Sequence, residues 1–225
     1  MSQQKNIKAW AKVLEKRQLI YPDERIVSFL AANYPDIDTN SSFKALDIGF
    51  SSGRHIALLR DYGFETYGID YNAAAVDTVS RLYNEKTKNV NLQVADISNL
   101  PYTSEFFDVV ICWGAIFYKT IDYIKKDLEL IKNRMSKGGK MIINFRTKDN
   151  WFFGKGSAIT EGITYELDAS AGSYEGITYT FLDQDEITSV IQSVGFNIFN
   201  FERLDLFKNN AQEQHSWIIC WLEKQ

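Results

Sequence analysis

The stretch of sequence that decides the fold runs from Ala45 to His55 and reads ALDIGFSSGRH. Its apolar beginning predicts a β-strand, and the residues after Gly53 predict a helix with apolar positions at Ile56 and Leu59. A strand, a glycine-bearing turn and a helix N-terminus together present backbone N–H groups that a ligand can approach closely. Asp47 comes at the carboxyl end of the strand, which is the edge where open α/β sheets bind ligands. We therefore expect the functional site at this turn.

The spacing of small residues in the turn narrows the class of ligand. The dinucleotide-binding fingerprint is G-x-G-x-x-G, whereas here the small residues are Gly49, Ser51 and Gly53. Asp47 stands two residues before the first of them, and a carboxylate repels a phosphate but attracts a cationic amino-acid group. This spacing disfavours a dinucleotide-dependent oxidoreductase and favours a ligand that carries an ammonium group.

Strand and helix patterns alternate along the chain after the turn, which is typical of a parallel sheet with helices on both faces. Asp183 and Glu186 predict a capping box for a helix that ends at Val194. Two strands without a helix between them then predict an antiparallel pair at one sheet edge. The predicted strands are Glu65 to Ile69, Val90 to Ala95, Phe107 to Cys112, Met141 to Phe145, Phe196 to Phe201 and Trp217 to Leu222; the predicted helices include Ala73 to Tyr83 and Ile121 to Met135, with Gly138-Gly139 as the turn that ends the latter.

The pattern Asp47-x-Gly49-x-Ser51-x-Gly53 resembles the first motif of class I S-adenosylmethionine-dependent methyltransferases, acid-x-Gly-x-Gly-x-Gly, with Ser51 at the middle glycine. The resemblance implies a Rossmann-like α/β fold with a mostly parallel seven-stranded sheet. It also implies S-adenosylmethionine as the cofactor and S-adenosylhomocysteine as the product. In that family the ends of the second, third and fourth strands hold the ribose, the adenine and the methyl-donor end. The cofactor-binding residues implied here are Asp47, Gly49, Phe50, Ser51, Gly53, Arg54, His55, Asp70, Tyr71, Asp96, Ile97, Trp113 and Gly114.

Acids at the ends of three successive strands support this interpretation. A single aspartate at such a position is often a helix cap. Asp47, Asp70 and Asp96 together are hard to explain by capping alone. Asp108 opens its strand instead of closing it, so we expect it at the opposite edge of the sheet with a structural role.

We expect one methyltransferase domain over residues 1–225, divided into an N-terminal helical cap (1–42), a cofactor-binding core (43–146), a β-flap (147–181) and a C-terminal helix with a strand pair (182–225). In the cap, Trp10, Val13 and Leu14 share one face of a first helix, and Pro22 stands near the first position of a second. These helices either cover the sheet or form a lid that points Tyr21 into the site.

The flap is the segment that distinguishes this chain. Glu161 to Tyr165 and Glu175 to Tyr179 repeat the same five-residue sequence, EGITY, on either side of a run of small residues, which predicts a β-hairpin. Because the segment follows the carboxyl end of a strand, we expect it over the methyl-donor side, where it encloses a small acceptor with the N-terminal helices. The alternative is a packed flap that contacts no ligand.

Composition limits the partners and the surroundings of the protein. The net charge of −4 gives no broad attraction to nucleic acid, and no apolar run reaches membrane-spanning length. Two cysteines are too few for a disulfide framework, and the polar N-terminus lacks a signal peptide's apolar core. We expect a soluble, cytoplasmic protein that contacts neither nucleic acid nor membrane and uses no metal; the sequence does not indicate an oligomeric state.

The resemblance implies transfer of a methyl group by in-line displacement to an oxygen or nitrogen atom of a small molecule. A general base is needed only for a hydroxyl or a protonated amine. Two alternatives stay open: a catalytically silent S-adenosylmethionine-binding protein, which Ser51 favours, and a methyltransferase for macromolecules. The candidates for catalysis are His55, Tyr21, Tyr118, Arg146, Trp151 and His215, of which Arg146 suits a carboxylate or phosphate on the acceptor and His215 is either a site residue or an exposed residue at a strand edge.

Overall fold

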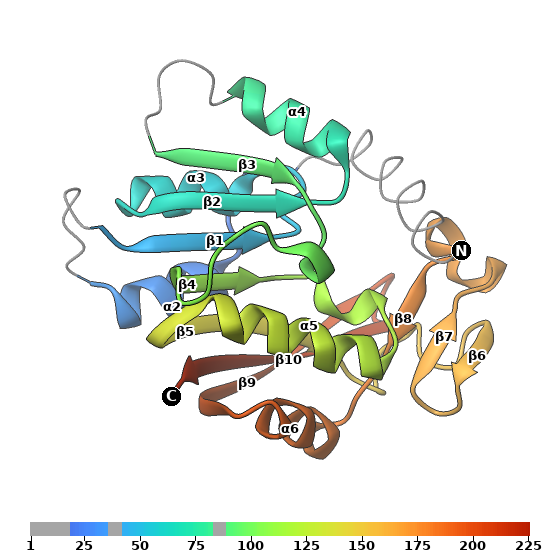
Figure 1. Ribbon diagram of the computed structural model, residues 1–225. Helices are drawn as coiled ribbons and strands as arrows, with labels where there is room; N and C mark the ends of the chain where they lie inside the picture. The colour runs from blue at the N-terminus through green and yellow to red at the C-terminus, as the bar shows by residue number, and fades with distance from the viewer. Residues whose placement is uncertain (1–18, 36–41, 83–88) are drawn as a thin grey trace.

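A computed structural model describes residues 19–35, 42–82 and 89–225. Seven strands form one sheet in the order β3-β2-β1-β4-β5-β10-β9, and a second sheet has the order β6-β7-β8 (Figure 1). The elements of the large sheet are β1 (Lys44–Ile48), β2 (Glu65–Asp70), β3 (Val90–Val94), β4 (Phe107–Cys112), β5 (Met135–Arg146), β9 (Phe196–Lys208) and β10 (Glu213–Lys224).

The first five strands are parallel, and the last two are the antiparallel pair that the sequence predicts. β10 pairs with both β5 and β9, so the last strand of the chain lies inside the sheet and β9 forms its edge. Both strands extend beyond the predicted ranges because the pairing continues from Glu213↔Lys208 to Lys224↔Phe196. The predicted α/β class and sheet arrangement are confirmed.

Helices cover both faces of the large sheet. On one face, α2 (Glu24–Asn33) and α3 (Arg54–Asp61) pack against residues of β1, β4, β5 and β10, and α4 (Ala73–Leu82) packs beside α3. On the other face, α5 (Ile121–Arg134) and α6 (Gln184–Ser193) cover the alternate residues of the same strands. Successive side chains of a strand point to opposite faces, so the nearly continuous buried runs of β1, β2 and β4 supply both apolar faces. None of the helices in the part of the chain that the structure describes is long and apolar enough to span a membrane.

The small sheet lies beside the large one, on the side toward which β1 to β4 run (Figure 1). It consists of β6 (Ser157–Thr160), β7 (Thr164–Glu166) and β8 (Thr178–Thr180), with the short 3-10 helix η3 (Ala169–Tyr174) between β7 and β8. The repeated segments pair with each other, so that Tyr165 lies opposite Tyr179, which is the predicted hairpin. Tyr179 and Phe181 join the same hydrophobic cluster as Phe117 and Phe145, and the flap therefore packs firmly on the main domain.

The structure corrects three local predictions. The predicted helix at 121–135 ends at Arg134, and Gly138-Gly139 lie within β5 beside a register shift against β4. A Cβ at Gly139 would stand 2.8 Å from the Ser136 oxygen, so close backbone contact explains this glycine. Pro22 precedes the helix instead of starting it, because Asp23 is the N-cap and accepts from the Arg25 N–H. The predicted first helix, around Trp10, lies outside the described residues.

Asp108 and the capping box behave as predicted. Asp108 Oδ2 accepts a hydrogen bond from the Lys44 N–H at 2.8 Å, and the Asp108 carbonyl accepts from the Tyr34 hydroxyl. These contacts join β1 and the end of α2 to the start of β4, at the edge opposite the site. The Asp183 side chain accepts from the Glu186 N–H, and the Glu186 side chain accepts from the Asp183 N–H, as a capping box requires.

Candidate active site

In the turn between β1 and α3, every second residue from 49 to 53 has a left-handed backbone conformation. The φ angles are 71° at Gly49, 52° at Ser51 and 77° at Gly53. Glycine adopts this region freely, whereas Ser51 does so under strain. At Gly53 the chain also leaves no space, since a Cβ would stand 2.6 Å from a methyl carbon of Val79 on α4. The turn therefore requires glycine at its last position for two reasons, and Ser51 adopts the conformation that the missing glycine would have.

Asp47 is a buried carboxylate with an unmet hydrogen-bonding capacity. Its side chain is 2% exposed, and no residue in the described part of the chain forms a hydrogen bond with Oδ2. Burial raises the pKa of Asp47 to about 8, against the opposing effect of Arg54. The nearest basic nitrogen is His55 Nδ1 at 3.9 Å, which is too long for a hydrogen bond. A ligand ammonium group placed at Oδ2 would both satisfy this atom and favour its ionised form.

His55 lies behind the turn instead of facing a reacting atom. Its Nε2 accepts the Asp23 N–H at 3.4 Å, which leaves the ring proton on Nδ1, toward Asp47. Burial, and secondly the positive charge of Arg54, lower the pKa of His55 to about 3. A buried neutral imidazole that already accepts a backbone proton is poorly placed to act as a general base.

Three other predicted residues of this turn contribute in different ways. Phe50 is buried, and its ring lies close to Gly68, where a Cβ would stand 2.7 Å from Phe50 Cδ1. Arg54 donates to the Tyr21 carbonyl at 3.4 Å. The side chain of Tyr21 is 78% exposed, so the structure does not enclose it in the site as the predicted lid would.

Asp70 closes β2 and organises the turn. Its Oδ2 accepts the Ser51 N–H at 2.9 Å, and its Oδ1 accepts the Asn72 N–H at 2.8 Å. Each carboxylate oxygen has two lone pairs, so both oxygens can accept a further hydrogen bond from a ligand. Burial raises the pKa of the neighbouring Tyr71, and the charges of Asp70 and Asp96 raise it further. Tyr71 therefore lies between the ends of β2 and β3.

Asp96 closes β3 and has more partners than the sequence indicates. It caps the 3-10 helix η1 (Ile97–Asn99) by accepting the Ser98 N–H, and it pairs with Lys119 Nζ at 2.9 Å. Although burial raises its pKa, these contacts outweigh burial and lower the pKa of Asp96 below its usual value. Lys119 also pairs with the buried Asp127 at 2.7 Å. Ile97 is buried next to this cluster, and its predicted role over the adenine ring stays a prediction.

Trp113 and Gly114 follow β4, beside the Asp47 turn. Gly114 has a φ of 70° and donates its N–H to Asn144 Oδ1 at 2.7 Å. That N–H is therefore used within the protein and cannot bind a ligand without breaking this contact. Gly49 lies close by, since a Cβ there would stand 3.1 Å from the Ala115 Cβ.

The remaining candidates gather around the carboxyl end of β5. Arg146 is the last residue of β5 and lies opposite Trp217 on β10. Tyr118, at the end of the 3-10 helix η2 (Ile116–Tyr118), has its ring 5.2 Å from that of Tyr179. Burial and the Tyr179 hydroxyl raise the pKa of Tyr118 well above its usual value, so this phenol stays protonated.

His215 is buried, and the alternative of an exposed residue at a strand edge is wrong. Its ring lies 5.4 Å from that of Phe152 and stacks on Trp217, and burial lowers its pKa below the usual value. Trp151 lies 6.4 Å from the same imidazole ring and donates its backbone N–H to the Gln214 carbonyl.

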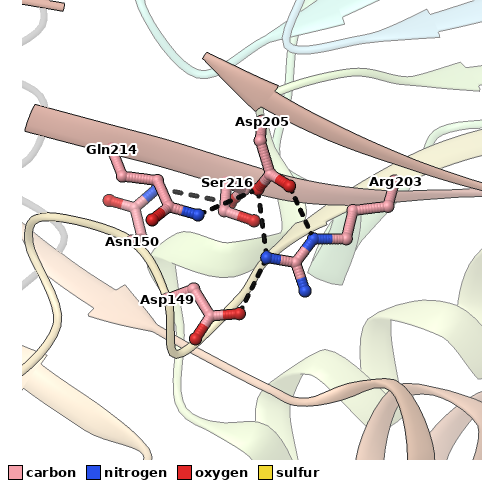
Figure 2. Close-up of polar contacts among 6 residues, drawn as sticks. All are labelled: Asp149, Asn150, Arg203, Asp205, Gln214 and Ser216. Atoms are coloured by element: carbon pink, nitrogen blue, oxygen red, sulfur yellow. Dashed lines mark hydrogen bonds and ion pairs between the residues drawn. The ribbon is translucent and has the colours of Figure 1, made fainter. Parts of the chain in front are cut away.

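A polar network fixes the segment after β5 to the β9–β10 hairpin (Figure 2). Arg203 on β9 contacts Asp149 at 2.8 Å and Asp205 at 2.9 Å. Gln214 donates to Asp205, and the Asn150 side chain donates to the Ser216 carbonyl at 3.3 Å. The network holds the start of the flap segment beside β10, where Trp151 and His215 meet.

Sequence reasoning missed two groups of residues. The pairing of Lys119 could have been predicted in part from the sequence. Asp127 falls on the apolar face of the predicted helix, and a carboxylate buried there needs a cation as its partner. The aromatic side chains around Arg146 give no such signal, since they come from four separate elements. Within the described ranges, no cluster of three or more histidine, cysteine, aspartate or glutamate residues is arranged to hold a metal ion.

Comparison with known proteins agrees with this geometry. Residues 45–139 match the family model of the methyltransferase domain. Among solved structures, an S-adenosylmethionine-dependent methyltransferase from Methanosarcina mazei aligns with a TM-score of 0.69 and 14% identity, covering 91% of this chain and 98% of that one. The 1,6-didemethyltoxoflavin-N1-methyltransferase of Burkholderia thailandensis, solved with its acceptor and S-adenosylhomocysteine, aligns with a TM-score of 0.66 and 16% identity over 90% of this chain and 77% of that one.

A curated relative is similar over a shorter range. EEF1A lysine methyltransferase 2 of Danio rerio is 36% identical over 92 residues, which are 40% of this chain and 38% of that protein. The match thus covers well under half of either protein. Together, the family model over residues 45–139 and the fold of the described chain agree with a class I S-adenosylmethionine-dependent methyltransferase domain, as the motif predicted.

Proposed function

We propose that this protein transfers the methyl group of S-adenosylmethionine to an oxygen or nitrogen atom of a small molecule. The observation that carries the cofactor part is the partnerless Asp47 Oδ2, buried at the carboxyl end of β1 beside a turn with three left-handed residues. A buried oxygen without a partner is costly, and an α-ammonium group supplies the missing donor.

Other residues of the domain have matching roles in this proposal. The backbone of the turn from Gly49 to Gly53 approaches the methionine portion, and Asp70 accepts the ribose hydroxyls while it holds Ser51 in place. Tyr71, Asp96 and Ile97 surround the adenine, and Trp113 with Gly114 flanks the methyl-donor end. When bound, S-adenosylmethionine supplies a methyl group already activated by the positive sulfur, so the protein has to align the acceptor and exclude water.

The packing of the flap against the main domain supports the proposal that the acceptor is a small molecule. It packs at the carboxyl edge of the sheet, where Tyr179 contacts Phe117 of η2 with ring centroids 5.9 Å apart. Thr180 also donates to the Lys119 carbonyl at 2.6 Å. Enclosure by packed aromatic side chains suits a molecule that is surrounded on binding. The similarity to a lysine methyltransferase favours a second candidate, a protein acceptor.

Calorimetric titration of S-adenosylhomocysteine tests the cofactor site. The wild-type protein is expected to bind it and to ignore NADH. Asp70→Ala is expected to weaken binding by about 10- to 100-fold, because a hydrogen bond to a charged group contributes about 1.5–3 kcal/mol. Asp77→Ala, which removes an exposed carboxylate on α4, is the matched control and should bind normally. Failure of the wild type to bind would refute the proposal.

The class of acceptor requires a second measurement. Transfer of tritiated methyl groups is followed with a metabolite fraction and with a protein fraction of the same cell extract. Label in the metabolite fraction is the expected result. Label confined to the protein fraction would replace the small-molecule proposal with the protein-acceptor candidate.

A further inference from the structure

Arg146 is a buried cation at the carboxyl edge of the sheet, and its charge has no anionic partner within residues 19–35, 42–82 and 89–225. The residue is 8% exposed. Among the residues that the structure describes, no carboxylate forms an ion pair with it, and its one hydrogen bond is a long contact of 3.4 Å from Nη2 to the Tyr179 hydroxyl. Nε and Nη1 are buried without any hydrogen-bond partner. Three N–H groups, one on Nε and two on Nη1, are therefore unsatisfied.

Aromatic rings surround the guanidinium group. Its central carbon lies 4.4 Å from the ring centroid of Tyr179, 5.0 Å from that of Phe117, and 5.4 Å from those of Phe152 and Trp217. Such rings attract a cation. The rings thus hold the guanidinium in place, but they supply no oxygen or nitrogen acceptor for the donors on Nε and Nη1.

The neighbours of this cation connect it to the end of β4. Phe117, whose ring centroid lies 5.0 Å from the guanidinium carbon, belongs to η2, which follows Trp113 and Gly114. Tyr179, whose hydroxyl lies 3.4 Å from Nη2, has its ring 5.2 Å from that of Tyr118 at the end of η2.

We propose that Arg146 binds an anionic oxygen group, a carboxylate or a phosphate, on the methyl acceptor. The inference rests on the proposed function and narrows its substrate class to anionic small molecules. A guanidinium group offers planar, charge-assisted hydrogen bonds that match both kinds of anion. The aromatic rings around the guanidinium exclude water from these bonds.

Binding of simple probes tests the proposal without any methyl transfer. Benzoate, phenyl phosphate and the uncharged benzamide are titrated calorimetrically into the wild-type protein, Arg146→Met and Arg146→Lys. We expect benzoate or phenyl phosphate to bind the wild type, to bind Arg146→Met at least tenfold more weakly, and to bind Arg146→Lys with intermediate affinity. Benzamide should not bind. The stronger of the two anions identifies the acceptor group as a carboxylate or a phosphate.

Arg203→Met is the matched control. Arg203 is a partly exposed arginine on β9 whose charge is already paired with Asp149 and Asp205 (Figure 2), so its loss should leave anion binding unchanged. Equal loss of binding in both variants would indicate nonspecific attraction to positive charge and overturn the proposal.

Thermal denaturation separates a ligand-binding arginine from a structural one. If Arg146 serves a ligand, Arg146→Met should melt at the wild-type temperature or above it, because methionine fills the site without unsatisfied donors. A large loss of thermal stability, together with absence of anion binding to the wild type, would show that Arg146 is a structural cation. If Arg146→Met does not fold, Arg146→Lys and Tyr179→Phe supply the same comparison. Anion binding that depends on Arg146, in a protein that does not bind S-adenosylhomocysteine, would support this site while refuting the proposed function.

Discussion

Replacing Gly53 with alanine should destabilise the domain through two separable effects. With φ at 77°, the new side chain enters the left-handed region, which costs about 1–2 kcal/mol. Its Cβ would also stand 2.6 and 3.0 Å from the two methyl carbons of Val79, an overpacking that costs about 1–3 kcal/mol. The expected loss in the free energy of unfolding is therefore about 2–5 kcal/mol.

A double-mutant cycle with Val79→Ala separates the two effects. Val79→Ala alone removes two buried methyl groups and should cost about 1–3 kcal/mol. In the double variant the new methyl group occupies part of the vacated space, so only the backbone strain persists. The combined loss should fall short of the sum of the single losses by about 1–3 kcal/mol.

Urea denaturation, followed by far-ultraviolet circular dichroism, measures all four proteins of the cycle. Additive losses, within about 0.5 kcal/mol, would refute the steric argument, because they would mean that the Cβ does not meet Val79. A loss below about 1 kcal/mol in Gly53→Ala itself would refute the requirement for glycine at this position.

Three further predictions concern the turn, the buried ions and the cofactor. Ser51→Gly should raise the free energy of unfolding by about 0.5–1 kcal/mol in urea denaturation by relieving the strain at φ 52°, whereas Ser51→Ala should give no gain. Lys119→Met should lower the free energy of unfolding by about 3 kcal/mol in the same assay, because it leaves the buried Asp127 without its cation. Lys148→Met, which breaks an exposed ion pair, should lower it by less than about 1 kcal/mol. Equal losses in the two variants would contradict the role assigned to burial. The raised pKa of Asp47, about 8, means that the free protein holds a proton there at neutral pH, and this proton must leave to the solvent when a ligand ammonium group binds to the carboxylate. The affinity for S-adenosylhomocysteine should therefore rise as pH increases from 6 toward 8. Calorimetry at pH 7 in buffers of different ionisation enthalpy should detect the release of about one proton on binding. Asp47→Asn should abolish this proton release.

The sequence was informative wherever a local pattern determined the outcome. The spacing from Asp47 to Gly53 predicted the turn, because only small residues fit a left-handed chain next to a helix. Short apolar runs that alternate with helical patterns predicted the strands, and the strand ends placed Asp70 and Asp96 at the carboxyl edge of the sheet. The repeated segments of the flap correctly predicted a hairpin, because polar and apolar residues alternate in both copies and the two copies pair with each other.

Contacts between distant segments could not be predicted in the same way. Asp96 looked available to a ligand because its partner, Lys119, is 23 residues away and comes close only when η1 and η2 pack together. His215 looked like an exposed residue because its burial depends on Phe152 and Trp217 closing around it. The surroundings of Arg146 depend on four elements at once, so no pattern within one element reveals them.

The position of β10 between β5 and β9 has a consequence for how the two parts of the site can open. The cofactor residues all fall within one stretch, from Asp47 to Gly114, on the parallel strands β1 to β4 and the turns that follow them. Arg146 instead requires Trp217 from a strand that lies antiparallel beside β5. A supersecondary unit such as the β9–β10 hairpin at the sheet edge can open locally while the rest of a domain stays folded. An opening of the β9–β10 hairpin would thus remove recognition of the anion and leave the cofactor site intact, so amide hydrogen exchange should be able to observe the two halves of the active site as separate cooperative units.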